Sequence, residues 1–156
     1  MELDDLKKKF DVLHKKYQLP SFDELNREFD VGKIELDSGN LVRDIRRGMM
    51  EKVVHYIRLA ELMVNPSQAS PIFLVMLKEI NTEDRKAIDA VLKNFVELEI
   101  NSYKADLGGE EKAEAEFIKH VYSTWTKTKP TLLQLIKVLE RNWGSNNTKK
   151  EKGYFN

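Results

Sequence analysis

Apolar residues recur at steps of three and four positions along most of the chain, which is the spacing of one face of an α-helix. The first such pattern stops at Leu19-Pro20 and predicts an N-terminal helix, because proline disfavours helical backbone in the residue before it. Ser21 followed by Glu24 matches a capping box, which predicts a short second helix. Residues 31–40 alternate only weakly and end in a turn sequence, so we interpret them as a connector.

The longest pattern predicts a helix over residues 41–64, ended by Asn65-Pro66, and we expect this helix to be the spine of the fold. After Pro71, residues 72–77 are apolar without interruption. A run of this length that is apolar all round predicts a short helix buried on every side, with a buried strand as the alternative. Pro71 favours the helix, because proline suits the first position of a helix.

The second half of the chain predicts three further helices. The first covers about 82–107 and is ended by two consecutive glycines. The second covers residues 110–126, and the third opens at Pro130 and ends at Gly144. The residues expected to face inward on this last helix are Leu132, Leu135, Ile136, Leu139 and Trp143.

Together these elements predict an all-α protein, an irregular helical bundle of five to seven helices around one buried short helix. Residues 1–143 are expected to form a single helical domain, which suits a chain of 156 residues. Residues 144–156 lack periodicity and are rich in lysine and turn-forming residues, so they predict a flexible basic C-terminal tail.

Composition and charge exclude several classes of protein. The 26 basic and 26 acidic side chains balance, so no long-range field draws the whole molecule to nucleic acid or to a membrane. The chain has no cysteine, which excludes disulfides, thiolate nucleophiles and zinc sites built on sulfur. No apolar stretch reaches membrane-spanning length and the start has no signal-peptide pattern, so we expect a cytoplasmic protein without a membrane partner. Nucleotide-binding glycine motifs are missing, and no cofactor is expected.

Four carboxylates are candidate metal ligands or catalytic acids. Two lie within the apolar stripe of the predicted helix over 82–107, and a tight hairpin after it would bring two more alongside. The four residues are Glu99, Asp106, Glu110 and Glu114. Carboxylates that converge away from water share protons or bind a hard cation such as Mg²⁺ or Ca²⁺. The competing interpretation is that they are ordinary acids, favoured by the helix dipole or neutralised by Lys104 or Lys112.

Arginines on the predicted helix over 41–64 form a candidate phosphate-binding row. The row consists of Arg43, Arg47 and Arg58 on the solvent side, with Arg46 at the edge of the apolar stripe. Arg47 is spaced to pair with Glu51 on the same helix, so a mixed, salt-bridged exterior is the favoured interpretation.

Basic residues are more uniform towards the C-terminus and form a candidate nucleic-acid-binding surface. They are Lys127, Lys129, Lys137, Arg141, Lys149, Lys150 and Lys152. Phosphates are the ligands that such a surface would bind, and a gel shift at two salt concentrations would test it. The competing interpretation is a lysine-rich end that only increases solubility.

The function that these features favour is a non-enzymatic protein–protein interaction or self-associating module, with another protein or a second copy as partner and a homodimer as the expected assembly. Catalytic motifs are missing, and the apolar run over 72–77 adds apolar surface that a small monomer does not easily hide. The first alternative is a nucleic-acid-associated protein that binds phosphates through the basic C-terminal region. The second alternative is a carboxylate-metal enzyme.

Overall fold

The computed structural model describes residues 3–153, with side chains described as far as Ser145. Six α-helices, two 3-10 helices and no strand are present in residues 3–153, which confirms the all-α prediction. The elements are α1 (Leu3–Tyr17), α2 (Phe22–Phe29), η1 (Val31–Lys33), α3 (Leu41–Val64), η2 (Pro66–Gln68), α4 (Pro71–Leu77), α5 (Thr82–Gly108) and α6 (Glu111–Gly153).

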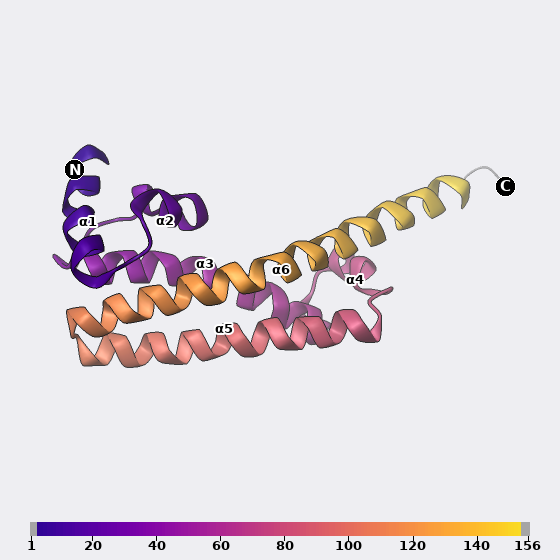
Figure 1. Cartoon of the computed structure of the whole chain (residues 1–156). Helices are drawn as coiled ribbons and strands as arrows, with labels where there is room; N and C mark the ends of the chain where they lie inside the picture. The colour runs from indigo at the N-terminus through magenta and orange to yellow at the C-terminus, as the bar shows by residue number, and fades with distance from the viewer. Residues whose placement is uncertain (1–2, 154–156) are drawn as a thin grey trace.

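Three long helices form the body of the molecule. Each of α3, α5 and α6 contacts the other two, and α5 and α6 lie antiparallel on either side of the hairpin at Gly109 (Figure 1). α1 lies near this hairpin, while α4 packs on α6 towards the opposite end of the body (Figure 1). The core is formed mainly by side chains of the three long helices, among them Met49, Val53, Phe95, Leu98, Ile118 and Val121.

Several helix ends follow the caps that the sequence predicts. Ser21 and Glu24 form the predicted capping box, in which the backbone N–H of Ser21 donates to the Glu24 carboxylate at 2.8 Å. α3 has the predicted bounds, and it begins where the Asn40 side chain accepts a hydrogen bond from the backbone N–H of Arg43 at 3.2 Å. Gly109 closes α5 with a φ of +71°, a left-handed conformation that favours glycine.

The prediction of a buried short helix over 72–77 is wrong in its burial, although the helix itself is present. No residue of α4 is buried, and Ile72 is 60% exposed. α4 packs on α6 with one side, while Ile72 and Leu74 remain exposed. Phe73, Met76 and Leu77 turn towards that side and are partly buried there. In residues 3–153 none of the helices is both long enough and apolar enough to cross a membrane.

The predicted break at Pro130 is also wrong, because α6 is a single helix of 43 residues that contains this proline. Proline removes one backbone hydrogen bond, but the side chains of Thr128 and Leu132 on either side of it are buried in the core. The burial of these two side chains keeps the helix continuous at the position where proline removes a backbone hydrogen bond. α6 also continues through Gly144, and glycine inside a helix costs only about 1 kcal/mol. The mobility of the tail over 144–156 stays a prediction, as does the single domain over 1–143.

Of the residues expected to face inward on α6, three are buried and two are not. Leu132, Leu135 and Leu139 are in the core, whereas Ile136 and Trp143 are exposed. A rotation of ~100° per residue places the two exposed side chains at one edge of the stripe that the three leucines form. The sequence pattern could not distinguish this edge from the centre of the stripe.

Candidate functional site

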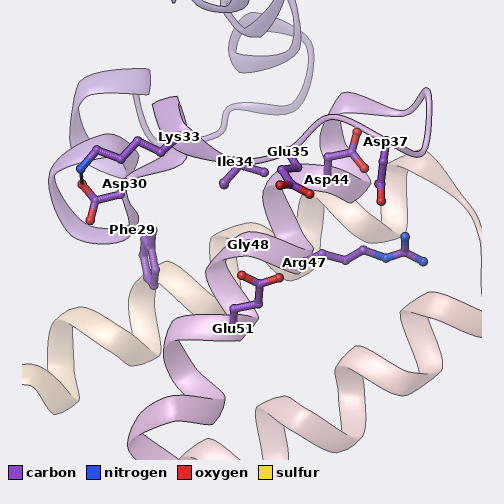
Figure 2. Close-up of a pocket in the computed structure, with 10 residues that line it drawn as sticks. All are labelled: Phe29, Asp30, Lys33, Ile34, Glu35, Asp37, Asp44, Arg47, Gly48 and Glu51. Atoms are coloured by element: carbon purple, nitrogen blue, oxygen red, sulfur yellow. Dashed lines mark hydrogen bonds and ion pairs between the residues drawn. The ribbon is translucent and has the colours of Figure 1, made fainter.

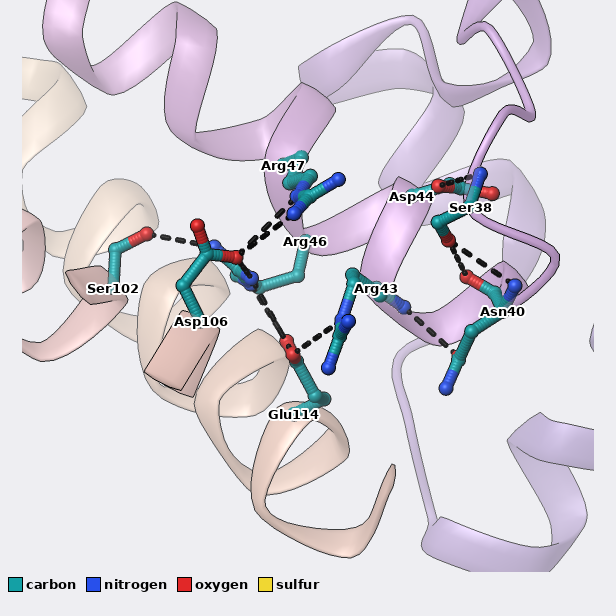
Figure 3. A network of polar contacts seen from close by, with 9 residues as sticks. All are labelled: Ser38, Asn40, Arg43, Asp44, Arg46, Arg47, Ser102, Asp106 and Glu114. Atoms are coloured by element: carbon teal, nitrogen blue, oxygen red, sulfur yellow. Dashed lines mark hydrogen bonds and ion pairs between the residues drawn. The ribbon is translucent and has the colours of Figure 1, made fainter. Parts of the chain in front are cut away.

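The largest fully buried side chain in the described residues is that of Arg46, whose guanidinium lies between α5 and α6 (Figure 3). Its Nε donates to Glu114 Oε2 at 2.6 Å, its Nη1 to Ser102 Oγ at 2.9 Å and its Nη2 to Asp106 Oδ1 at 2.5 Å. Arg46 is 2% exposed and Glu114 is fully buried. One guanidinium therefore joins three helices, through buried hydrogen bonds to Ser102 and Glu114 and a partly exposed one to Asp106.

Local sequence explains how these groups meet. Ser102 and Asp106 are four residues apart on α5, so they share the face that continues the buried stripe of Leu98. Glu114 lies in the first turn of α6, directly after the hairpin. A hairpin of two antiparallel helices brings residues on either side of the turn to the same level, which places Asp106 close to Glu114.

Two further arginines of α3 complete the cluster (Figure 3). Arg43 Nε donates to Glu114 Oε1 at 3.2 Å, and Arg47 Nη2 donates to Asp106 Oδ1 at 3.2 Å. We call Arg43, Arg46, Arg47, Ser102, Asp106 and Glu114 the arginine cluster. Three guanidinium groups thus face two carboxylates, so the acids are balanced by positive charge within the protein.

Hydrogen bonds keep both signs of charge in place within the cluster. The hydrogen bond from Arg46 lowers the pKa of Asp106 below its ordinary value, more than burial raises it. Burial alone would lower the pKa of Arg46, but its hydrogen bonds to Glu114 and Asp106 outweigh that effect and raise it. Asp106 and Arg46 are therefore both ionised at neutral pH.

Acid is expected to destabilise the protein in part through Asp106. The stability that ionised Asp106 contributes is complete above the pKa of an unfolded aspartate, about 3.9. It is lost as the pH falls through the lower pKa that Asp106 has in the folded protein. We expect the urea midpoint of the wild type to fall more steeply between about pH 5 and about pH 2 than that of Asp106→Asn. Asp89→Asn, on an exposed position of α5, is the control and should follow the wild type. Parallel curves for the wild type and Asp106→Asn would contradict the expectation.

The four carboxylates predicted as metal ligands do not all meet. Asp106 and Glu114 converge, but their oxygens accept hydrogen bonds from arginine. Glu99 accepts a hydrogen bond from the Tyr103 hydroxyl at 3.0 Å on the outside of α5. Glu110 is exposed beside the start of α6. Among the residues that the structure describes, no three His, Asp or Glu side chains are grouped so that they could hold a metal ion.

The arginines of the cluster have partners that the sequence does not predict. The favoured interpretation was a salt-bridged exterior with Arg47 paired to Glu51, in preference to a phosphate-binding row. Arg43 and Arg47 do form ion pairs, but with carboxylates on either side of the hairpin. The sequence pattern set Arg46 at the edge of the apolar stripe and did not predict its burial, and it missed Ser102 altogether. A polar residue four positions after the buried Leu98 was the available signal for Ser102.

A second cluster of charge lines a pocket of about 550 Å³ between the connector over 30–37 and α3 (Figure 2). Five carboxylates line it, those of Asp30, Glu35, Asp37, Asp44 and Glu51, together with Lys33 and Arg47. Asp44 is buried and accepts a hydrogen bond from the backbone N–H of Ser38 at 3.2 Å, which ties the connector to α3. The pocket is thus acidic, and cationic groups are the ligands its charge would attract.

The basic residues predicted to bind nucleic acid are only partly available on α6. Lys127, Lys137 and Arg141 are exposed. Lys129 donates to Glu28 at 2.8 Å, and this hydrogen bond lowers the pKa of Glu28. The side chains of Lys149, Lys150 and Lys152 lie outside the described residues. The basic surface is therefore diluted by one internal ion pair.

The arginine cluster joins α3 to α5 and α6, and the ion pair at Glu28 joins α2 to α6. Comparison of the chain with protein-family models, with curated proteins and with solved structures finds no match.

Proposed function

We propose that the protein is a non-enzymatic interaction module that binds another protein, or a second copy of itself, through exposed faces of its helices. The observation that carries this proposal is the apolar surface at the end of the molecule where α4 packs on α6. Large apolar side chains exposed there are Ile72 and Leu74 on α4 and Ile136 and Trp143 on α6. Apolar side chains gathered on one part of a surface are typical of protein-binding sites.

The length of α6 adds support. Its 43 residues correspond to ~65 Å, compared with ~40 Å for the 27 residues of α5, and its C-terminal part projects beyond the body (Figure 1). Ile136 and Trp143 are seven residues apart and therefore lie on the same side of this projecting helix. A helix that presents apolar side chains at this spacing is suited to pack against a helix or groove of a partner.

The two alternative functions receive less support. A carboxylate-metal enzyme would need free carboxylate oxygens, whereas those of Asp106 and Glu114 accept hydrogen bonds from arginine. A nucleic-acid-associated protein would use the basic C-terminal region, and there Lys129 is paired with Glu28. Retention of duplex or single-stranded nucleic acid in a gel shift at low salt would favour that alternative.

Charged residues at the exposed apolar positions of α6 are expected to abolish partner binding without unfolding the protein. The variant carries Ile136→Glu and Trp143→Glu, and the control carries Val12→Glu, an exposed position on α1. Proteins cross-linked to the tagged protein in its host cells are identified by mass spectrometry. A partner cross-linked by the wild type and the control should fall by about tenfold or more with the double variant. Equal recovery with all three proteins would contradict the proposal.

A further inference from the structure

α5 carries a second apolar face, on the side opposite to its core stripe. Ile100, Tyr103 and Leu107 are 51%, 61% and 91% exposed. Together with the partly buried Val96 they follow one another at steps of four, three and four residues, which keeps them within ~60° of arc. We call these four residues the outer stripe of α5. Neither α3 nor α6 covers its three exposed members.

We propose that the outer stripe binds the same stripe of a second copy, with the two α5 helices antiparallel across a two-fold axis between Asn101 and Ser102. This pairing places Val96 beside the partner's Leu107, and Ile100 beside the partner's Tyr103. Each apolar side chain thereby meets another, and the contact is repeated on the other side of the axis, as two-fold symmetry requires. The inference rests on the proposed function, because it names one partner and one face for the interaction module.

Charge along one edge of the stripe supports the antiparallel arrangement. Glu97 and Lys104 are both exposed, and their spacing of seven residues puts them on the same edge. In an antiparallel pair the same edges of the two helices meet, so Glu97 lies near the partner's Lys104 and Lys104 near the partner's Glu97. Opposite charges at such flanking positions determine partner and orientation in paired helices.

Lys93 argues against the parallel arrangement. It lies one turn before Val96 on the same side of α5, so parallel helices would bring it against the partner's Lys93. The antiparallel arrangement separates these two ammonium groups by about 25 Å along the helix axis.

The other edge of the stripe carries Glu99 and Asp106, which would face each other across the pair. Asp106 already accepts hydrogen bonds from Arg46 and Arg47. The side chain of Arg47 beside it is 44% exposed, so this edge has a positive charge of its own to balance Glu99. The repulsion between the two acids is therefore reduced.

Self-association is tested by sedimentation equilibrium of the full chain from about 1 µM to about 1 mM. Contact over a few helix turns is at the small end of specific interfaces, below about 1,200 Å², so we expect a dimer that dissociates on dilution. Leu107→Glu should raise the dimer dissociation constant by about tenfold or more, whereas Val12→Glu should leave it unchanged. The Leu107 side chain is almost fully exposed, so its replacement does not threaten the fold.

Exchange of the edge charges tests the orientation. Glu97→Lys and Lys104→Glu should each weaken the dimer by about tenfold, and the double variant should restore it, because each new charge again meets its opposite. The inference is overturned by a monomer at all concentrations, by a dimer that Leu107→Glu leaves intact, or by a double variant that does not recover. All these substitutions lie on α5, so their failure leaves the separate test with the α6 variants unaffected.

Discussion

Replacement of Arg46 with alanine is expected to lower the free energy of unfolding by about 3 to 5 kcal/mol. Most of this loss of stability arises because the remaining carboxylates are left without their main partner. Less of it arises from the lost attraction of the ion pair itself. Glu114 is fully buried, and without Arg46 its charge keeps only the hydrogen bond from Arg43 at 3.2 Å. A buried carboxylate without sufficient partners is costly, because the protein interior does not replace its hydration. Urea unfolding followed by circular dichroism at neutral pH measures the change.

Arg47→Ala is the matched control for this prediction. Arg47 binds the same Asp106 oxygen but is 44% exposed, so its removal should cost less than about 1 kcal/mol. A combined Arg46→Met and Glu114→Leu variant removes both buried charges and should recover much of the stability that Arg46→Ala loses. Equal effects of Arg46→Ala and Arg47→Ala would contradict the prediction, because burial would then make no difference.

The arginine cluster also explains how α3 is aligned with the hairpin. A guanidinium is planar and its donors have fixed directions, so Arg46 can satisfy Ser102, Asp106 and Glu114 together only in one arrangement of the three helices. Apolar side chains such as those of Met49 and Leu98 tolerate small shifts along the helix axes. The polar contacts at the hairpin end therefore specify an alignment that apolar packing alone leaves looser.

The sequence predicts most of the helices because their apolar stripes are long and their ends carry recognisable caps. α3 matches its predicted bounds of 41–64, and Ile88, Val91, Phe95 and Leu98 are buried on α5 as the pattern indicates. These features are local, since spacing along a helix decides which side chains share a face. The spacing of residues along each helix is therefore sufficient to predict these helices and their buried side chains.

The errors concern features that depend on neighbours distant in the sequence. α4 is apolar all round, but its main neighbour is α6 and none of its residues is buried, and the sequence does not say how many sides of a helix find a neighbour. Pro130 is a strong local signal for a helix end, yet buried side chains on either side of it keep α6 continuous. In both cases tertiary packing overrides the local preference.

The sequence predicts the acids of the candidate site but not the arginine that pairs with them. The glycine pair and the positions of Asp106 and Glu114 indicate that two acids meet at the hairpin, and they do. Their counterion could not be foreseen, because Arg46 is 60 and 68 residues away from them in the chain. The outer stripe of α5 was missed for a related reason. The sequence alone does not distinguish two apolar faces on one helix from one broad apolar stripe. The positions of the neighbouring helices decide which of the two faces is covered.

Replacement of Trp125 with alanine is expected to cost about 3 to 5 kcal/mol of unfolding free energy. Trp125 is 3% exposed and lies among three other aromatic rings, with its ring centroid 5.4 Å from that of Phe29, 5.5 Å from that of Tyr56 and 6.0 Å from that of Phe95. Its Nε1 donates to Glu28 at 2.9 Å. Alanine would leave a cavity between these rings and remove a donor from a buried carboxylate.

Two further variants separate these contributions. Trp125→Phe keeps an aromatic ring but loses the hydrogen bond to Glu28, so it should cost about 1 to 3 kcal/mol. Trp143→Ala removes the second of the two tryptophans in the chain from an exposed position, and it should change the stability by less than about 1 kcal/mol. Urea unfolding followed by circular dichroism compares all three variants without relying on tryptophan fluorescence. If Trp125→Ala were no more destabilising than Trp143→Ala, the aromatic cluster around α6 would not be the packed centre that its burial indicates.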